Sequence, residues 1–249
     1  MAEETIQVKE EILGEAPLGV RRKREFDLES WQPKTDMGKK VKNGGINDID
    51  EILNSGKRIL ETEIVDYLVP NMQIELLLLG QSKGKFGGGK RSIWRQTQKK
   101  TSEGNKPKFA TLALVGNKDG YVGIGFGKSR ETMPAREKAI RNAKLNLIKV
   151  KRGCGSWECS CGKDHSIPFK VEGKSASVKI ILMPAPKGTK LTVEKECQKI
   201  LNFAGIKDVY SKTSKSRTKM GLIKACFEAL KNLSKVKVNQ QHATRLGVR

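Results

Sequence analysis

The stretch that decides the fold is FATLALVGNKDGYVGIGFG, residues 109–127. Residues 109–115 alternate between two rows of mostly apolar side chains, which is the period of a β-strand. Asn-Lys-Asp-Gly at 117–120 is turn chemistry, and residues 121–126 alternate again, with glycine recurring in one row. The stretch therefore predicts an antiparallel β-hairpin.

The segments on either side of the hairpin extend it into a small α+β domain. Residues 131–148 carry apolar side chains at helical spacing on one face and cations on another, which predicts a basic-faced helix packed on the sheet. Residues 72–79 are Leu-rich, so strand and helix compete, and the glycine that follows favours strand. Residues 48–56 predict a short helix, with Asp48 and Glu51 as a capping box.

The second half of the chain indicates another small domain. Residues 175–183 predict a strand, residues 192–204 a helix with Thr192 as its N-cap, residues 208–211 a short strand and residues 222–233 a final helix. We therefore divide the chain into an extension of mixed charge that orders only on a partner (1–45), a first domain (46–150), a connector (151–170), a second domain (171–234) and a basic tail (235–249).

Composition limits the classes of function. The 249 residues include 49 Lys and Arg against 27 Asp and Glu, a net charge of +22 that needs a polyanionic partner. With 37% hydrophobic residues, the chain is suited to two small cores rather than one large one. Its richest apolar run falls far short of the ~18 residues that a membrane helix needs, and its first residues do not resemble a secretory signal. We expect a cytosolic protein without a membrane span.

Residues 83–100 form the most basic stretch, with seven cations and no acid. Four glycines let its backbone lie close to a ligand, and two aromatic side chains among the charges can stack on bases. We predict contact with RNA; the alternative is a solvated loop that only keeps the protein soluble. The residues assigned to this contact are Lys83, Lys85, Lys90, Arg91, Trp94, Arg95, Lys99 and Lys100.

The same stretch imitates a nucleotide-binding P-loop. Residues 84–90, GKFGGGK, fit its first seven positions. The next position must supply a hydroxyl group to magnesium, and here it holds Arg91. The sequence therefore disfavours nucleotide hydrolysis.

A second basic loop precedes the final predicted helix and contains Lys212, Lys215 and Arg217. Free amide groups at a helix N-terminus attract phosphate, so this loop is a candidate phosphate site. The alternative is a solvated basic surface.

The connector is the candidate metal site. Cys154, Cys159, Cys161 and His165 are spaced C-x4-C-x-C-x3-H among glycines. Four such ligands suit a closed tetrahedral structural zinc site, which would fold a segment that lacks a core. The single-residue gap between the second and third cysteines departs from the usual C-x2-C spacing. Reduced thiols beside an unrelated histidine remain the alternative, and Cys197 and Cys226 fit ordinary buried cysteines on apolar helix faces.

Long runs of the sequence resemble those of a known protein family. The run ATLALVGNKDGYVGIGFGKSRETMPAREKAIRNAKLNLIKVKRGCGSWECSCGKDHSIPFKVEGKSASVKIILMPAPKGT, followed by ILNFAGIKDVYSKT, resembles the small ribosomal subunit proteins of the S-five family, called S-two in eukaryotes. The preceding ILETEIVDYLVP resembles the form shared by archaea and eukaryotes, and the cysteines resemble the archaeal version. The resemblance is collinear over residues 46–235.

The resemblance implies an α+β fold: an N-terminal domain like double-stranded-RNA-binding domains and a C-terminal β-α-β-α domain with a left-handed crossover. It implies a place in the small subunit of the cytoplasmic ribosome, beside the channel through which messenger RNA enters. Partners would be small-subunit rRNA, the messenger and neighbouring proteins such as the S-four and S-eight families. It adds Lys108, from the loop between the first two strands, and Lys187, from PAPKG, as rRNA contacts. GQSKGKFGGGKRSIW looks inserted relative to the short family loop.

Three functions follow from these patterns. The first is a structural rRNA-binding constituent of the small subunit that supports translation accuracy, with no active site, no membrane and no small-molecule substrate. The second is a free RNA chaperone or processing factor built from the same modules. The third, an NTPase, rests on the imitation P-loop alone.

Overall fold

The computed structural model describes residues 31–81, 91–159, 161–216 and 218–248. The chain forms two units, Met1–Gln32 and Pro33–Arg249, and the helices and strands named below all belong to the second. None of the helices in the described ranges is long and apolar enough to cross a membrane.

The predicted hairpin is confirmed as the centre of the first sheet. Strands β3 (Gly104–Gly116) and β4 (Tyr121–Ser129) pair antiparallel in the register Leu114 to Ile124. The strand expected at 72–79 is β1 (Gln73–Leu77), which pairs with the other edge of β3. The order along the sheet is β1-β3-β4-β5.

The first sheet contains two strands that the sequence did not predict. β2 (Arg95–Thr101) pairs with the outer part of β3, inside the stretch assigned to a basic loop. Its side chains are nearly all exposed, so it shows no apolar alternation. β5 (Leu147–Lys149) takes residues that we expected to end a helix, and its Leu147 is buried.

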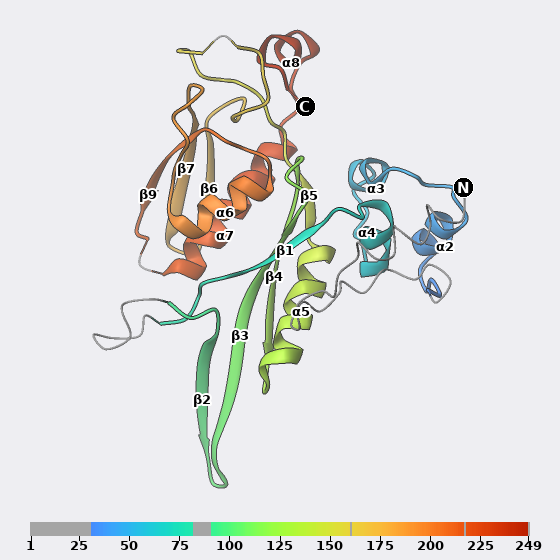
Figure 1. Ribbon diagram of the computed structural model, residues 1–249, viewed down its shortest axis with the longest axis vertical. Coiled ribbons are helices and arrows are strands. Elements are labelled where there is room, and N and C mark those ends of the chain that lie inside the picture. Colours follow the sequence, from blue (N-terminus) through green and yellow to red (C-terminus); the bar gives the residue numbers. More distant parts are fainter. Residues whose placement is uncertain (1–30, 82–90, 160, 217, 249) are drawn as a thin grey trace, which may run out of the picture. The chain divides into compact units, whose positions relative to one another are not determined.

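Helix α5 (Thr132–Leu145) lies directly on β4 (Figure 1). A Cβ atom on Gly125 would stand 2.1 Å from the backbone nitrogen of Ala143, and Cβ atoms on Gly123 and Gly127 would meet the helix backbone equally closely. Three alanines of the helix face these glycines and are fully buried: Ala135, Ala139 and Ala143. The predicted basic-faced helix is thus confirmed, and its contact with the sheet is made by backbone and methyl groups.

Three short helices precede the first sheet: α2 (Asp36–Lys42), α3 (Ile49–Asn54) and α4 (Thr62–Leu68). α3 confirms the helix expected at 48–56, but its N-cap residue Asp48 makes no side-chain capping bond. α4 was not predicted.

α2 differs from the expectation that residues 1–45 order only on a partner. Its N-cap is Thr35, whose hydroxyl group accepts from the backbone of Gly38. The carboxylate of Glu61 accepts from the backbone N–H groups of Lys34 and Thr35, at 2.8 and 2.6 Å. An acid far along the sequence therefore fixes the start of this helix, and the residues around 34–42 alone could not predict that contact.

The second sheet has the order β6-β7-β9-β8. β6 (Val171–Ser175) and β7 (Val178–Pro184) form a hairpin, β9 (Val209–Ser214) lies next to β7, and β8 (Leu191–Thr192) pairs parallel with β9. Helix α6 (Lys195–Phe203) connects the two parallel strands.

The remaining helices are α7 (Lys219–Lys235), packed on β6 and β7, and α8 (Gln240–Leu246). α7 confirms the final predicted helix. It approaches β6 as α5 approaches β4, because a Cβ on Gly173 would stand 2.1 Å from the carbonyl oxygen of Ala225.

Two expectations for the second half are corrected, and the tail contains a helix that was not predicted. The strand expected at 175–183 is split by a turn at Ala176, whose φ is +54°, and β6 precedes that turn. Thr192 is not the N-cap of α6, because it belongs to β8; Glu194 caps the helix by accepting from the backbone of Glu196 and Cys197. The basic tail contains α8.

The two sheets share one hydrophobic cluster, where the composition led us to expect two cores. The row of β4 that faces away from α5 belongs to it, together with apolar residues of β7 and α7. Buried Glu196 of α6 reinforces the junction by accepting from the backbone N–H of Leu78 at 3.0 Å. The α+β fold class is confirmed.

We expect Gly125→Ala to lower the free energy of unfolding by about 2 to 3 kcal/mol, because the added methyl group overpacks the contact between α5 and β4. Urea unfolding of the full chain measures this difference. Gly45→Ala is the matched control, since a Cβ there meets only the carbonyl oxygen of Lys40, at 3.3 Å. Equal stabilities of the two variants would contradict the close approach.

Candidate metal centre and nucleic-acid surfaces

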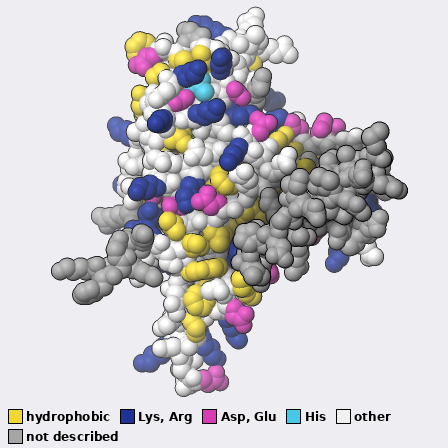
Figure 2. Space-filling view, viewed as in Figure 1, with side chains coloured by type: hydrophobic (Ala, Val, Ile, Leu, Met, Phe, Trp, Pro, Cys, Tyr) yellow, Lys and Arg dark blue, Asp and Glu magenta, His cyan; other side chains and the backbone are white. Residues whose placement is uncertain are grey.

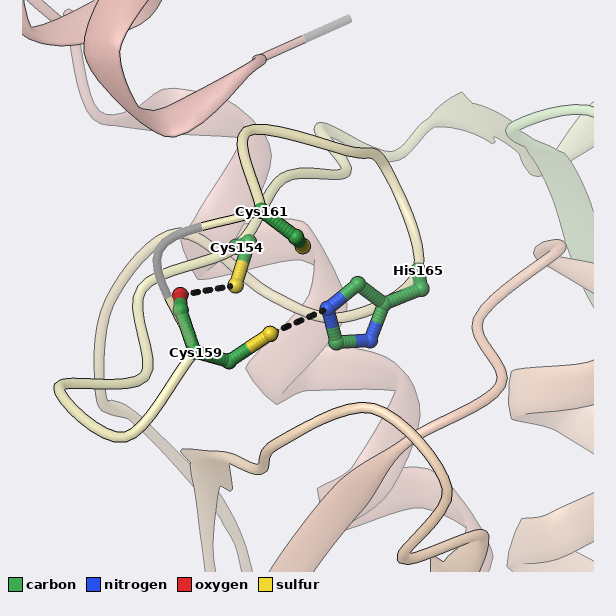
Figure 3. A group of neighbouring side chains, drawn as sticks. All are labelled: Cys154, Cys159, Cys161 and His165. Atoms are coloured by element: carbon green, nitrogen blue, oxygen red, sulfur yellow. Dashed lines mark hydrogen bonds between the residues drawn. The ribbon is translucent and has the colours of Figure 1, made fainter.

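The four residues predicted to bind metal come together. Their ligand atoms lie within 4.8 Å of one another, and Figure 3 shows the side chains of Cys154, Cys159, Cys161 and His165 converging on a common centre. The segment between them is closed at its base by an isolated bridge in which Gly153 and Ser166 exchange backbone hydrogen bonds of 3.0 and 3.1 Å. A loop without regular structure thus brings four donors together.

The glycines of this loop serve two purposes. Gly162 has a φ of +58°, a conformation that glycine adopts without strain. Gly155 is needed for space, since a Cβ there would stand 2.0 Å from the carbonyl oxygen of Pro168.

The surroundings shift the pKa values of two of the thiol groups in opposite directions. A hydrogen bond from the backbone of Lys187, assisted by Cys161 and His165, lowers the pKa of Cys159 to about 6. Burial raises the pKa of Cys154 to about 11, and its thiol donates to the carbonyl oxygen of Cys159 at 3.0 Å. A metal ion binds thiolates, so loading this candidate site with zinc would release protons.

His165 is oriented by an acid that the sequence analysis missed. Its Nδ1 lies 2.8 Å from Oδ2 of Asp208, which is 4% exposed. The other carboxylate oxygen, Oδ1, accepts from the backbone N–H groups of Gly188 and Lys190 at 3.1 and 2.8 Å. With its proton on Nδ1, the imidazole turns Nε2 toward the sulfur of Cys159, 3.8 Å away. Ligand histidines in metalloproteins are commonly held in this way by a carboxylate.

The donor set fits zinc. Three thiols and one imidazole nitrogen match a tetrahedral structural site, in which sulfur ligands lie about 3.8 Å apart at Zn–S distances of about 2.3 Å. The four ligand atoms lie within 4.8 Å of one another, a spacing that one tetrahedral ion could bridge. The other two cysteines, Cys197 and Cys226, are buried on helix faces as expected, and contact with Cys226 together with burial raises the pKa of Cys197.

The C-terminal tail is attached to the metal loop, which we define as residues 153–166, the segment that carries the four candidate ligands. The backbone N–H of Cys154 donates to the carbonyl oxygen of Leu246 at 2.8 Å. Gly247 has a φ of +59° and lies close to Gly162. A Cβ atom on Gly247 would stand 2.0 Å from the carbonyl oxygen of Gly162. The C-terminal end of α8 therefore covers one side of the loop.

The predicted RNA-binding cations divide into several surfaces. Lys83, Lys85, Lys90 and Arg217 lie outside the described residues, as does the P-loop-like sequence. The residues after that sequence form β2, whereas a P-loop opens a helix. Arg91 is exposed, Trp94 is half-buried, and the exposed Lys187, Lys212 and Lys215 lie on other segments. On the face shown in Figure 2, Lys and Arg side chains are widely spread.

The most ordered of these surfaces is the two-stranded ribbon of β2 and the outer part of β3, which projects beyond the other strands in Figure 1. Residues directly opposite each other share a face, and Lys99 pairs with Lys106 while Thr97 pairs with Lys108. Arg95 follows in the same row of β2 because side chains alternate along a strand. This row of four exposed cations, the ribbon face, consists of Arg95, Lys99, Lys106 and Lys108.

Comparison with known proteins agrees with this architecture. Residues 93–151 match the family described as ribosomal protein S5, N-terminal domain, and residues 173–245 match ribosomal protein S5, C-terminal domain. The chain is 53% identical to small ribosomal subunit protein uS5 of Nanoarchaeum equitans, over 85% of this chain and 91% of that protein. It is 49% identical to the protein of the same name from Aeropyrum pernix over the same shares, and 46% identical to that from Methanobrevibacter smithii over 90% and 99%. The chain belongs to the uS5 family of small ribosomal subunit proteins.

Proposed function

We propose that this chain is a structural constituent of the small subunit of the cytoplasmic ribosome, where it binds rRNA and catalyses no reaction. The observation that carries the proposal is the ribbon face. Lys99 lies directly opposite Lys106, and a like-charge pair in this position destabilises a strand pair. One acid, Glu103, forms an ion pair with Lys106 at 2.6 Å. Phosphate groups of RNA would offset the remaining repulsion, and neutralising them releases counterions.

The ribbon suits RNA backbone rather than bases. Besides Thr97, its exposed row holds three lysines and one arginine, which contact phosphates at any sequence. Side chains of this kind position a protein on a folded RNA by its shape and charge. This is the kind of contact that a scaffold protein of a ribosomal subunit needs.

Finer assignments follow from membership of the family. We propose that the chain lies beside the channel through which messenger RNA enters, that it supports accurate decoding, and that proteins of the S-four and S-eight families are its neighbours. The support for these assignments is the collinear family resemblance across both domains.

We also propose that Cys154, Cys159, Cys161 and His165 hold one structural zinc ion. The support is the convergence of four suitable donor atoms within 4.8 Å, with His165 already oriented by Asp208. The ion would stabilise the loop between the two domains, because that loop forms no helix or named strand of its own.

The test of the ribbon is Lys99→Glu. We expect it to weaken binding to a small-subunit rRNA transcript and to lower the slope of log K against log salt by about 1 to 2. The new carboxylate faces Lys106, so the strand pair itself gains a favourable contact. Filter binding across a salt series gives both quantities.

The control is Gln96→Glu with Gln98→Glu, which changes the charge of β2 by the same amount on its other face. Equal slopes for the two variants would show that the ribbon face does not meet RNA. High-salt washing of ribosomes separates the scaffold role from that of a free RNA chaperone, because a scaffold protein stays with the small subunit in stoichiometric amount and a chaperone is released.

For zinc, we expect one equivalent per chain by elemental analysis of the purified protein. Cys159→Ser with Cys161→Ser should lose it, since serine hydroxyl groups replace two thiolate ligands. Cys197→Ala is the control that keeps the metal, because Cys197 is buried away from the cluster. A folded wild-type protein free of zinc would refute the site.

Asp208→Asn tests the orientation of His165. The amide retains an acceptor for the backbone of Gly188 and Lys190 but no longer holds the imidazole proton on Nδ1 by charge. We expect zinc affinity, measured by competition with a chelator, to fall about 10- to 100-fold. An unchanged affinity would show that Asp208 only supports the loop.

A further inference from the structure

A basic hollow of about 780 Å³ lies beside the metal loop and is lined by five lysines. Lys199 pairs with Glu75, and the other four come from four separate segments. Lys118 comes from the β3–β4 turn, Lys163 from the metal loop, Lys187 from the β7–β8 loop and Lys207 from the residues before β9. None of these four side chains forms an ion pair with the described part of the chain. Figure 2 shows Lys and Arg side chains around a histidine near the upper end of the view.

The acidic side chains of the hollow already have partners other than the four lysines. Asp208 accepts from His165 and from two backbone N–H groups. Asp164 lies 3.5 Å from Arg152, and Glu75 lies 2.7 Å from Lys199. The four lysines therefore represent uncompensated positive charge in one place.

Arg152 adds a further donor. It is 9% exposed, and its Nη2 atom lies 2.5 Å from Asp119. Its Nε atom is buried and has no hydrogen-bond partner among the described residues. An unpaired buried donor is costly, and buried donors in folded proteins are usually paired, so this one favours an acceptor bound from outside the chain.

The backbone that carries the lysines is fixed in advance. Lys118 has a φ of +62°, and its N–H donates to Phe203 at 3.0 Å. Gly205 approaches so closely that a Cβ would stand 2.4 Å from the carbonyl oxygen of Lys118. The N–H of Lys207 donates to His165 at 2.8 Å. A non-glycine residue held at positive φ is strained, and strain of this kind gathers at functional positions.

We propose that this hollow binds backbone phosphates of RNA, an inference that rests on the proposed rRNA-binding function and names a second contact distinct from the ribbon face. Lysines act as point charges toward phosphate, and the hollow lacks the glycine-rich cradle of a nucleotide site. Phe203, the one Phe, Tyr or Trp residue that the described chain contributes to its lining, is 8% exposed and offers no free face to a base. The other ring, that of His165, is also 8% exposed and is held by Asp208. The hollow therefore holds the backbone and is indifferent to sequence.

The test is Lys118→Glu with Lys207→Glu in the full chain, measured by filter binding to a small-subunit rRNA transcript. We expect affinity at about 0.1 M salt to fall tenfold or more and the salt slope to fall by roughly two, because two phosphate contacts are lost. Lys170→Glu with Lys179→Glu is the matched control: it makes the same charge change at exposed positions outside the hollow and should leave the slope near the wild-type value.

Lys118→Gln with Lys207→Gln guards against misfolding, since it adds no acid beside Asp119 or Asp208, and it should lower the slope by the same amount. Equal slopes for these variants and the control, with the wild type binding normally, would overturn the phosphate site and leave the proposed function intact. Failure of the wild type to bind the transcript would instead refute the proposed function. If the control pair Lys170→Glu with Lys179→Glu lowered the salt slope as much as the hollow variants do, net charge alone would explain the effect, and the inference would also be overturned.

Discussion

The direct contact between α5 and β4 is the constraint on which the first domain depends. Glycines on the strand and alanines on the helix let the two backbones approach until no space remains for a Cβ atom. Folded interiors are packed as densely as organic crystals, so such a contact fixes the position of the helix closely. It also assigns the other row of β4 to the cluster shared with the second sheet. The second domain uses the same contact between Gly173 and α7.

The sequence predicts those helices and strands whose own residues show a hydrophobic periodicity. The β3–β4 hairpin, α5 and α7 each show their own period, and all three are present. β2 is different, because an exposed polar strand has no period and forms only where β3 extends far enough to pair with it. The start of α6 was misplaced for a related reason: Thr192 is a good N-cap residue, but its pairing in β8 moves the cap to Glu194.

The candidate sites divide in the same way. The four candidate metal ligands lie within one short segment, so their spacing was sufficient to predict that they meet. Asp208 is 43 residues from His165, and the four unpaired lysines of the hollow come from four segments. Only the fold brings such groups together, and the charge total of +22 gives no indication of where they meet. Lys106 was missed because its partner strand was missed.

The attachment of α8 to the metal loop has a consequence for the order of events during synthesis. Cys154 donates its N–H to Leu246, a residue that the ribosome adds 92 positions later. A nascent chain thus exposes all four ligands well before the segment that covers one side of them has been translated. The proposed zinc ion would therefore be able to bind before that cover arrives, and the finished helix would then slow its escape from the loop.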